Sequence, residues 1–307
     1  MTVTAPEEIA DLRRTAFGVA YRMLGSVAEA EDVVQDALIR VHDAAREGEH
    51  IESPRAYIAT VATRLAINHL RSARVRREAY VGEWLPEPLL TTDVADDPAA
   101  QAELTDSLSL AFLVVLETLS PEQRAAFLLR DVFDYGYDEI AAIIGTSEVN
   151  ARQFATRARR HVEARRPRFS ASDEQRDELA ARFFAAAQDG DLAALEALLA
   201  EDVVLRGDGG GKVPALARVL RGRERVARTF LAWAKLGARA GGAVRPARVN
   251  GQPGAVVLDA EGMIIGVMAL DVAGDHVAGI SSVVNPDKLG HLGAVGDMRA
   301  LLERGRR

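Results

Sequence analysis

The chain has 307 residues and is 48% hydrophobic, which is enough for two or three domains with sizeable cores. It has no cysteine, so disulfides, thiolate zinc sites and cysteine nucleophiles are excluded. The formal net charge of −7 argues against nucleic-acid binding by the whole surface, but arginines cluster at 71–77 and 152–168, whereas 79–106 has acidic and no basic residues. Two basic surfaces joined by an acidic tether fit a DNA-binding protein with separate contacts.

No segment reaches the roughly 20 apolar residues that span a bilayer. The N-terminal residues also lack the basic and apolar blocks of a signal peptide. We therefore expect a cytoplasmic protein.

Residues 8–75 show apolar residues at helical spacing, which predicts an all-helical region. Within it, the predicted helix Val27–Ala45 has an outer face made of carboxylates and polar groups around one isoleucine: Asp32, Gln35, Asp36, Ile39 and Asp43. Such a face suits a protein partner with a small apolar centre and a basic rim. A solvated helix face with one stray apolar residue explains the pattern equally well.

A further helix is expected to begin at Ser53-Pro54, because serine caps helices and proline fits the first helical position. Its outer side is predicted to carry Thr60, Thr63, Ile67, Arg71 and Arg74. The basic end of this helix favours phosphate contact, although cations also stabilise helix C-termini through the helix dipole. The following segment, Tyr80–Pro88, is apolar for a linker, and Trp84 and Leu85 suggest docking on another surface. Asp93–Ala100 is acidic, and we expect it to act either as a spacer or as a mimic of phosphates.

Residues 137–168 predict two helices joined by a tight turn. Gly145 suits the end of the first helix, and Thr146 or Ser147 suits the cap of the second. The second helix has small apolar residues on one face, and on the other Val149, Arg152, Gln153, Thr156, Arg157 and Arg160. These spacings predict a helix-turn-helix whose outer face enters the DNA major groove. A solvated, arginine-rich helix is the alternative.

The rest of the chain predicts an α+β domain. Helices are expected at Asp173–Asp189, Ala193–Ala200 and Glu224–Leu236, followed by β-like runs at 243–249, 255–258, 263–270 and 276–284. Helices followed by a meander imply a curved antiparallel sheet that wraps its helices.

Three blocks resemble sigma factors of the sigma-70 family. Asp32–Arg40 and Pro54–Arg64 look like region 2, and Thr118–Arg130 with the helix-turn-helix looks like region 4. No region 3 is present, so residues 8–168 are similar to the small extracytoplasmic-function (ECF) sigma factors. One departure is Val41-His42, where many members carry an aromatic residue.

The C-terminal part resembles the SnoaL-like domain of the nuclear-transport-factor-two-like superfamily. Together with Trp84–Pro88, the motifs Asp208–Lys212 and Asn285–Leu289 resemble the SigJ-like subgroup, whose fused SnoaL-like extension regulates the sigma factor in cis. The expected fold is therefore two all-α domains plus an α+β cone. The expected domains are 1–77 (region 2), 78–106 (linker), 107–168 (region 4) and 169–307 (SnoaL-like).

The resemblance implies a promoter-specific initiation factor and assigns roles to particular residues. Binding to the β′ clamp helices of core RNA polymerase is expected from Asp32, Gln35, Asp36, Ile39 and Arg40; the β flap is the other expected polymerase contact. An extruded base of the downstream promoter element is expected at the loop Glu47–Ser53, with strand contacts from Arg55, Thr60, Thr63, Arg64, Asn68, Arg71 and Arg74. Upstream-element contacts are expected from Ser147, Val149, Asn150, Arg152, Gln153, Thr156, Arg157 and Arg160.

Regulation is expected from a clasp in which the extension holds the linker and so keeps regions 2 and 4 compact. Its predicted contacts are Trp84, Pro86, Glu87, Asp208, Lys212, Asn285, Asp287 and Lys288. We expect no metal, cofactor, catalytic residue or separate anti-sigma factor. The alternative is an enzyme or small-molecule sensor, because the superfamily includes cyclases and isomerases with an Asp or His inside the cone. The candidates for that acid–base role are Asp208, His276, Asp259 and Lys212. The sequence is compatible with a cone that binds a small-molecule ligand and with one that does not.

Overall fold

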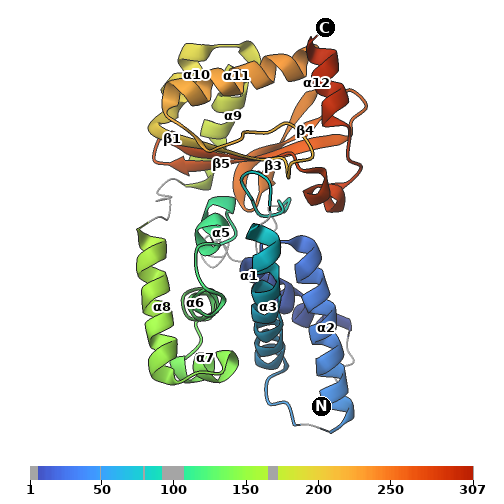
Figure 1. The fold of residues 1–307 in the computed structure, drawn as a ribbon, viewed down its shortest axis with the longest axis vertical. Helices are drawn as coiled ribbons and strands as arrows, with labels where there is room; N and C mark the ends of the chain where they lie inside the picture. Colours follow the sequence, from blue (N-terminus) through green and yellow to red (C-terminus); the bar gives the residue numbers. More distant parts are fainter. Residues whose placement is uncertain (1–5, 49, 79, 92–106, 165–171, 307) are drawn as a thin grey trace. The chain divides into compact units, whose positions relative to one another are not determined.

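The computed structural model describes residues 6–48, 50–78, 80–91, 107–164 and 172–306 (Figure 1). They form two compact units. Unit 1 comprises residues 1–78 and 115–165, and unit 2 comprises residues 79–114 and 166–307. The acidic stretch Asp93–Ala100 and the basic tail at 165–168 lie outside the described residues.

The first half of unit 1 is the helical region predicted for residues 8–75, and this prediction is confirmed. Its helices are α1 (Pro6–Leu24), α2 (Val27–Arg46) and α3 (Pro54–Glu78). The Ser26 hydroxyl accepts a hydrogen bond from the backbone N–H of Glu29 and so caps α2. Ser53 does the same for α3 through the N–H of Ala56.

The second half of unit 1 contains α6 (Pro121–Phe127), the short π-helix η1 (Leu128–Val132), α7 (Tyr137–Ile144) and α8 (Glu148–Glu163). Gly145 adopts φ 71° at the end of α7, where a side chain would be strained, and Ser147 caps α8. The two helices pack on a small core made of Ala126, Leu129, Ile140, Ala141, Ile143, Ala151 and Ala155. The predicted helix-turn-helix is therefore present.

Unit 2 is built on a six-stranded sheet with the order β2-β1-β6-β5-β4-β3. The strands are β1 (Leu199–Asp208), β2 (Leu220–Arg221), β3 (Ala243–Val249), β4 (Gln252–Leu258), β5 (Ile264–Ala273) and β6 (His276–Val283). The meander β3–β6 is antiparallel as predicted, but β1 pairs with β6 in parallel, so the sheet is mixed. The prediction missed β1 because its sequence follows a helix directly and carries two acidic residues, Glu201 and Asp202, in its first half.

One face of the sheet is covered by α9 (Asp173–Asp189), α10 (Leu192–Leu198) and α11 (Arg223–Arg239), as Figure 1 shows. The core between them includes Phe183 and Phe230, whose ring centroids are 4.8 Å apart. The C-terminal helix α12 (Met298–Arg306) packs on α11. Two 3₁₀ turns, η2 (Pro286–Lys288) and η3 (Gly290–Leu292), follow β6.

The opposite face of the sheet packs against the linker and the start of α5 (Leu110–Leu116). Leu85 and Leu110 are fully buried there against the strand residues Val249, Val256, Val267, Ala269 and Val283. None of the helices within the described part of the chain combines the length and hydropathy needed to cross a membrane.

Candidate nucleic-acid interface and linker-binding site

The outer face of α8 is open to solvent. Val149 is 67% exposed, and the predicted upstream-element residues around it are exposed except for the half-buried Thr156. Some of them also have local structural roles. Ser147 caps the helix, and Arg152 pairs with Glu148 at 2.8 Å while stacking over the Tyr137 ring. The buried residues of the helix are Ala151, Ala155, Ala158 and Val162.

The outer face of α2 is equally accessible. All five predicted polymerase contacts, Asp32, Gln35, Asp36, Ile39 and Arg40, are exposed. Ile39 is 58% exposed, which is unusual for a large apolar side chain with a buried face available on the same helix. An apolar residue ringed by charged and polar groups is the arrangement of a protein contact.

The predicted strand contacts on α3 divide into accessible and inaccessible residues. Arg55, Asn68 and the half-buried Thr60 can be reached from solvent. Thr63 is fully buried, and its hydroxyl donates to the carbonyl of Ala59, so its predicted place on the outer side of the helix is wrong, while its contact with DNA stays a prediction. The error arises because α3 is packed by α1, α2, α6 and α7, and so has a narrower outer face than the sequence pattern predicts. The side chain of Arg74 lies outside the described residues.

Two further α3 arginines contact helices of the second half of unit 1. Arg64 donates from Nε to the carbonyl of Ile143 at 3.0 Å and from Nη2 to the carbonyl of Ala142 at 2.9 Å. These carbonyls belong to the last turn of α7, where helical partners are missing and the dipole favours cations. Arg64 is therefore occupied by the helix-turn-helix in this structure.

Arg71 bonds Oε1 of Glu122 on α6 at 2.7 Å. Partial burial acts to raise the pKa of Glu122, but the hydrogen bond from Arg71 and further hydrogen bonds outweigh it, so the pKa lies below its ordinary value. Two of the predicted strand contacts thus bond groups of α6 and α7, although both side chains remain exposed.

Buried arginines also join the two halves of unit 1. Arg124 donates to the carbonyl of Met23 at 2.5 Å and to Glu117 at 2.7 Å. Arg22 lies over the Phe133 ring, 5.7 Å from its centroid. Burial lowers the pKa of Arg124 to about 9 and that of Arg22 to about 10. The halves therefore meet through specific polar contacts.

In unit 2, Asp208 at the end of β1 binds the linker. Its side chain is fully buried, and Oδ1 accepts from the Tyr80 hydroxyl at 2.5 Å while Oδ2 accepts from the backbone N–H of Leu85 at 2.8 Å. Lys288 neutralises the carboxylate at 2.7 Å and also donates to the carbonyl of Leu85 at 2.5 Å. Its ammonium group lies 4.4 Å from the centroid of the Trp84 ring, a cation–π contact.

Asn285 and the glycine loop complete this part of the site. The Asn285 amide donates to the Tyr80 hydroxyl at 2.9 Å, and burial and the Asp208 carboxylate raise the pKa of that hydroxyl. A Cβ on Gly210 would lie 2.3 Å from the Asn285 amide, and one on Gly211 would lie 3.0 Å from Val81. Both glycines also have positive φ, so this loop needs glycine for its conformation and for close approach to its neighbours.

A second anchor holds the end of the linker through Asn250, which has φ 52° in the β3–β4 turn. Its Oδ1 accepts from the N–H of Leu89 at 2.8 Å, and its Nδ2 donates to the carbonyl of Leu108 at 2.9 Å. Thr91 bonds the carbonyl of Arg248 and the N–H of Gly251. One side chain thus fixes both ends of the segment that leads from the linker to α5.

The predicted clasp residues do not all contact the linker. Asp208, Asn285, Lys288 and Trp84 meet in one site, and Pro86 is buried within the linker. Lys212 and Asp287 instead form an ion pair with each other. Glu87 is half-buried in the linker. Tyr80, Asn250 and His291, which bonds the carbonyl of Pro88 at 2.7 Å, were missed. Only the turn dipeptide Asn250-Gly251 gave a sequence signal for any of them.

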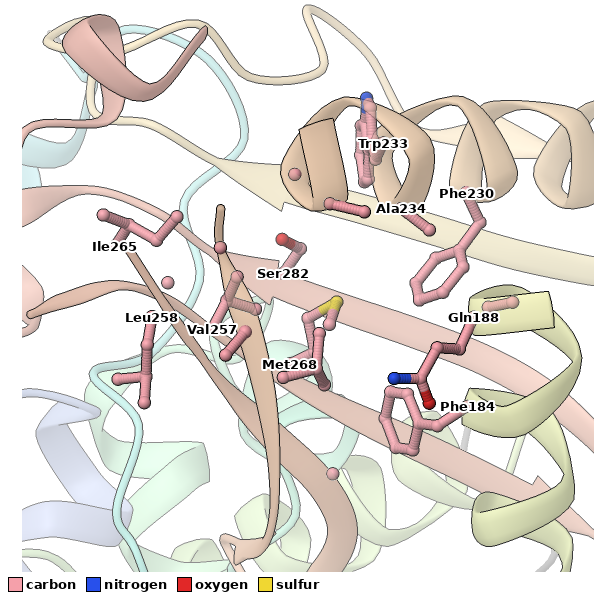
Figure 2. A pocket seen from close by; sticks show the side chains of 18 of the residues that line it. Phe184, Gln188, Phe230, Trp233, Ala234, Val257, Leu258, Ile265, Met268 and Ser282 are labelled. Carbon is pink, nitrogen blue, oxygen red and sulfur yellow. The ribbon is translucent and has the colours of Figure 1, made fainter. Parts of the chain in front are cut away.

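A cavity of about 1040 Å³ lies on the helix-covered face of the sheet (Figure 2). The four acid–base candidates Asp208, His276, Asp259 and Lys212 are not among its lining residues. Asp259 instead accepts from the backbone N–H groups of Glu261 and Met263 in the β4–β5 turn.

Comparisons with known proteins agree with this architecture. Residues 9–76 match the family model for sigma-70 region 2, 109–162 match sigma-70, region 4, and 180–278 match the SnoaL-like domain. The chain is 40% identical over 289 residues to the ECF RNA polymerase sigma factor SigJ of Mycobacterium tuberculosis, covering 92% of each protein. It is 32% identical to the probable ECF RNA polymerase sigma factor SigI of the same species, over 90% of this chain and 91% of that protein.

The solved crystal structure of M. tuberculosis SigJ superimposes with a TM-score of 0.75 at 36% identity. It covers 93% of this chain and 98% of that one. The matches to both relatives run over nearly the whole length of each protein, and so they take in the segments of this chain that match region 2, region 4 and the SnoaL-like domain. The chain therefore belongs to the ECF sigma factors of the sigma-70 family, in the SigJ-like group that carries a fused SnoaL-like domain.

Proposed function

We propose that this protein binds core RNA polymerase through α2 and reads promoter DNA through α3 and α8, under control of its own C-terminal domain. A sigma factor binds the polymerase and directs promoter-specific initiation, and both partners follow from the family. The assignment of individual residues is our proposal. The observation that supports it most is the pair of exposed faces, one centred on Ile39 and one on Val149, on the helices that the family uses for these contacts.

For α2 we propose the β′ clamp helices as the partner, with Ile39 at the centre and Asp32 and Asp36 at the rim. For region 4 we propose the β flap. Arg157, Gln153 and their neighbours on α8 would then read base edges and phosphates of the upstream element. Arg55, Asn68 and the loop 47–53 would hold the melted downstream strand, where unstacking a base costs a few kcal/mol that phosphate and pocket contacts offset.

Control by the C-terminal domain is proposed to act through the linker. The linker joins α3 to α5, so docking residues 80–91 on unit 2 limits how far regions 2 and 4 can separate by chain connectivity alone. The contacts of Arg64 and Arg71 with α7 and α6 are a second restraint, because they occupy DNA-binding candidates. Release of both restraints would free the two modules to span the polymerase.

We further propose that the protein is not an enzyme, needs no separate anti-sigma factor and works in the cytoplasm with the polymerase. The position of all four acid–base candidates outside the cavity lining supports a domain without catalysis. The domain boundaries at 77, 106 and 168 remain predictions.

The test is transcription in vitro with core RNA polymerase on genomic DNA, with the 5′ ends of transcripts mapped. We expect specific start sites that core polymerase alone does not use. Changing Trp84 to Ala should alter the amount of transcript and leave the start sites unchanged, since Trp84 belongs to the linker site and not to the DNA-reading faces.

A further inference from the structure

The cavity on the helix-covered face of the SnoaL-like sheet has the size and chemistry of a ligand site. Its volume of about 1040 Å³ is at the upper end of the range for small-molecule pockets. Its labelled lining residues in Figure 2 are largely apolar or aromatic, and come from α9, α11 and strands β4–β6: Phe184, Gln188, Phe230, Trp233, Ala234, Val257, Leu258, Ile265, Met268 and Ser282.

Charge is confined to exposed or paired positions of this lining. Asp177, Asp189 and Lys235 are exposed, and Arg248 pairs with Asp177 at 2.6 Å. The polar groups among the labelled lining residues are the Gln188 amide, the Ser282 hydroxyl and the Trp233 indole N–H. An ionised ligand group placed among the labelled residues would lose hydration, and the lining charges that could offset this loss are exposed or already paired, so its burial is costly. The lining therefore selects an uncharged, largely apolar molecule with one or two hydrogen-bonding groups.

The same strands carry the linker on their other face. Side chains alternate along a strand, so Val257 and Met268 line the cavity, while their neighbours Val256, Val267 and Ala269 belong to the core that buries Leu85 of the linker. At two linker anchors the adjacent residue lines the cavity: Gly207 precedes Asp208, and Val284 precedes Asn285.

Part of the sheet that separates the cavity from the linker consists of glycines, which expose their backbone to the cavity. Gly207, Gly254 and Gly266 line the cavity without a side chain. A Cβ on Gly254 would lie 2.1 Å from the carbonyl of Met268, so the backbone there is in close contact with the neighbouring strand. A bound molecule would touch main chain whose next residues hold the linker, and packed interiors transmit such displacements.

We propose that this cavity binds an uncharged, largely apolar small molecule and that the sheet passes its occupancy to the docked linker. The site is built for binding rather than chemistry. The coupling to the linker would let a ligand regulate initiation, and this part rests on the proposed role of the linker. Ligand binding by the cavity does not depend on that role.

Binding is tested on the full chain with N-phenyl-1-naphthylamine, a neutral apolar probe that fluoresces in apolar sites, and with decanol and decanoate as competitors. We expect saturable binding of one probe per chain, displaced by decanol and much less by the anionic decanoate. Ala234→Phe should weaken probe binding by about threefold or more, because it fills part of the cavity. The matched control is Ala232→Phe, at an exposed position of the same helix outside the lining.

Coupling is read from the two tryptophans, which are the only ones in the chain and lie at the two ends of the proposed path. In Trp233→Phe, the remaining Trp84 reports on the linker site. We expect decanol to change both its emission and its quenching by acrylamide, and expect no such change in the Ala234→Phe background at the same concentration.

Absence of saturable probe binding to the wild-type chain would overturn the site, as would equal affinities in Ala234→Phe and Ala232→Phe. Binding without any response of Trp84 would overturn the coupling. Should Ala234→Phe fail to fold, the decanol and decanoate comparison on the wild type still decides the ligand class. No step uses polymerase or promoter DNA, so failure here is distinguishable from failure of the proposed initiation function.

Discussion

Asp208 shows how one buried carboxylate can organise a segment far away in sequence. It accepts from Tyr80, Leu85 and Lys288 at once and has no exposed surface. A buried ion pair with several further hydrogen bonds contributes specificity more surely than net stability. The linker is therefore held in one defined position, because another arrangement would leave Asp208 or Lys288 uncompensated.

Removing one partner of this pair should be more damaging than removing both. We expect Asp208→Ala to lower the free energy of unfolding of unit 2 by about 3 kcal/mol, because Lys288 is left buried without its counter-charge. The double variant Asp208→Ala/Lys288→Met should recover part of that loss. Urea unfolding is measured for the wild type, for Asp208→Ala and Lys288→Met, and for the double variant; a double variant destabilised by the sum of the two single losses would refute the pairing argument.

A second buried carboxylate, Asp271 on β5, predicts a pH dependence. Burial raises its pKa to about 6, with Arg206 acting in the opposite direction. Between the unfolded pKa near 4 and this value, the folded chain binds more protons, so its contribution to stability is present at low pH and is lost as the pH rises through about 6.

The change Asp271→Asn should remove this contribution. Relative to the wild type, the variant should gain on the order of 2 kcal/mol as the pH rises from 4 to 7. Unfolding of both proteins at several pH values checks it. A constant difference between the two curves would show that Asp271 titrates normally. Asp275→Asn, in the exposed β5–β6 turn, is the control.

At the scale of elements, helix α8 has one face that packs within unit 1 and another that is proposed to contact DNA. Arg159 pairs with Asp131 at 2.8 Å through Nε and so belongs to the unit 1 fold, whereas Arg157 is exposed on the proposed DNA face. Arg157→Ala should weaken promoter binding of the reconstituted holoenzyme by about 1–3 kcal/mol if it reads a base. Arg159→Lys, which keeps the charge, is the matched control and should bind nearly as well. Equal affinities of Arg157→Ala and wild type would remove Arg157 from the reading face.

The contact between α3 and α6 makes a different prediction. Glu122→Gln weakens the ion pair with Arg71 and leaves every proposed DNA-contact residue, Arg71 included, unchanged in the sequence. Because the pair is partly exposed, its contribution is only about 0.2–1 kcal/mol. We expect a modest rise in promoter-specific transcript, up to about fivefold, with unchanged start sites. A fall in transcript would mean that Glu122 supports the active state instead of restraining Arg71.

How far the sequence predicted these elements depended on the kind of signal. Helix caps and apolar periodicity located the helix-turn-helix, because its turn glycine and serine cap act locally. Thr63 was misplaced because exposure on α3 depends on four neighbouring helices rather than on its own period. Strand β1 was missed because its pairing with β6 joins residues about 75 positions apart, and such pairing leaves no local pattern.

For the whole molecule, the three resemblance-based motifs pointed to the linker site. Three of the predicted extension residues, Asp208, Asn285 and Lys288, bond the linker in the folded chain. Tyr80 and Asn250 had no comparable signal, since a tyrosine in a linker and an Asn-Gly turn are common features with ordinary explanations. Their roles follow only from the folded chain, where the β3–β4 turn and β1 both meet the linker. The cavity likewise follows from packing rather than from any motif.

The central claim is that one chain joins promoter reading to an internal control by way of its linker. The most direct test is mapped transcription from genomic DNA by core RNA polymerase with the wild-type chain and with Tyr80→Phe, which removes one hydroxyl from the linker site. We predict specific start sites with both proteins and a different transcript yield with Tyr80→Phe. Absence of promoter-specific transcripts with the wild-type chain and with Tyr80→Phe would contradict the initiation function, and identical yields from both would contradict control through the linker.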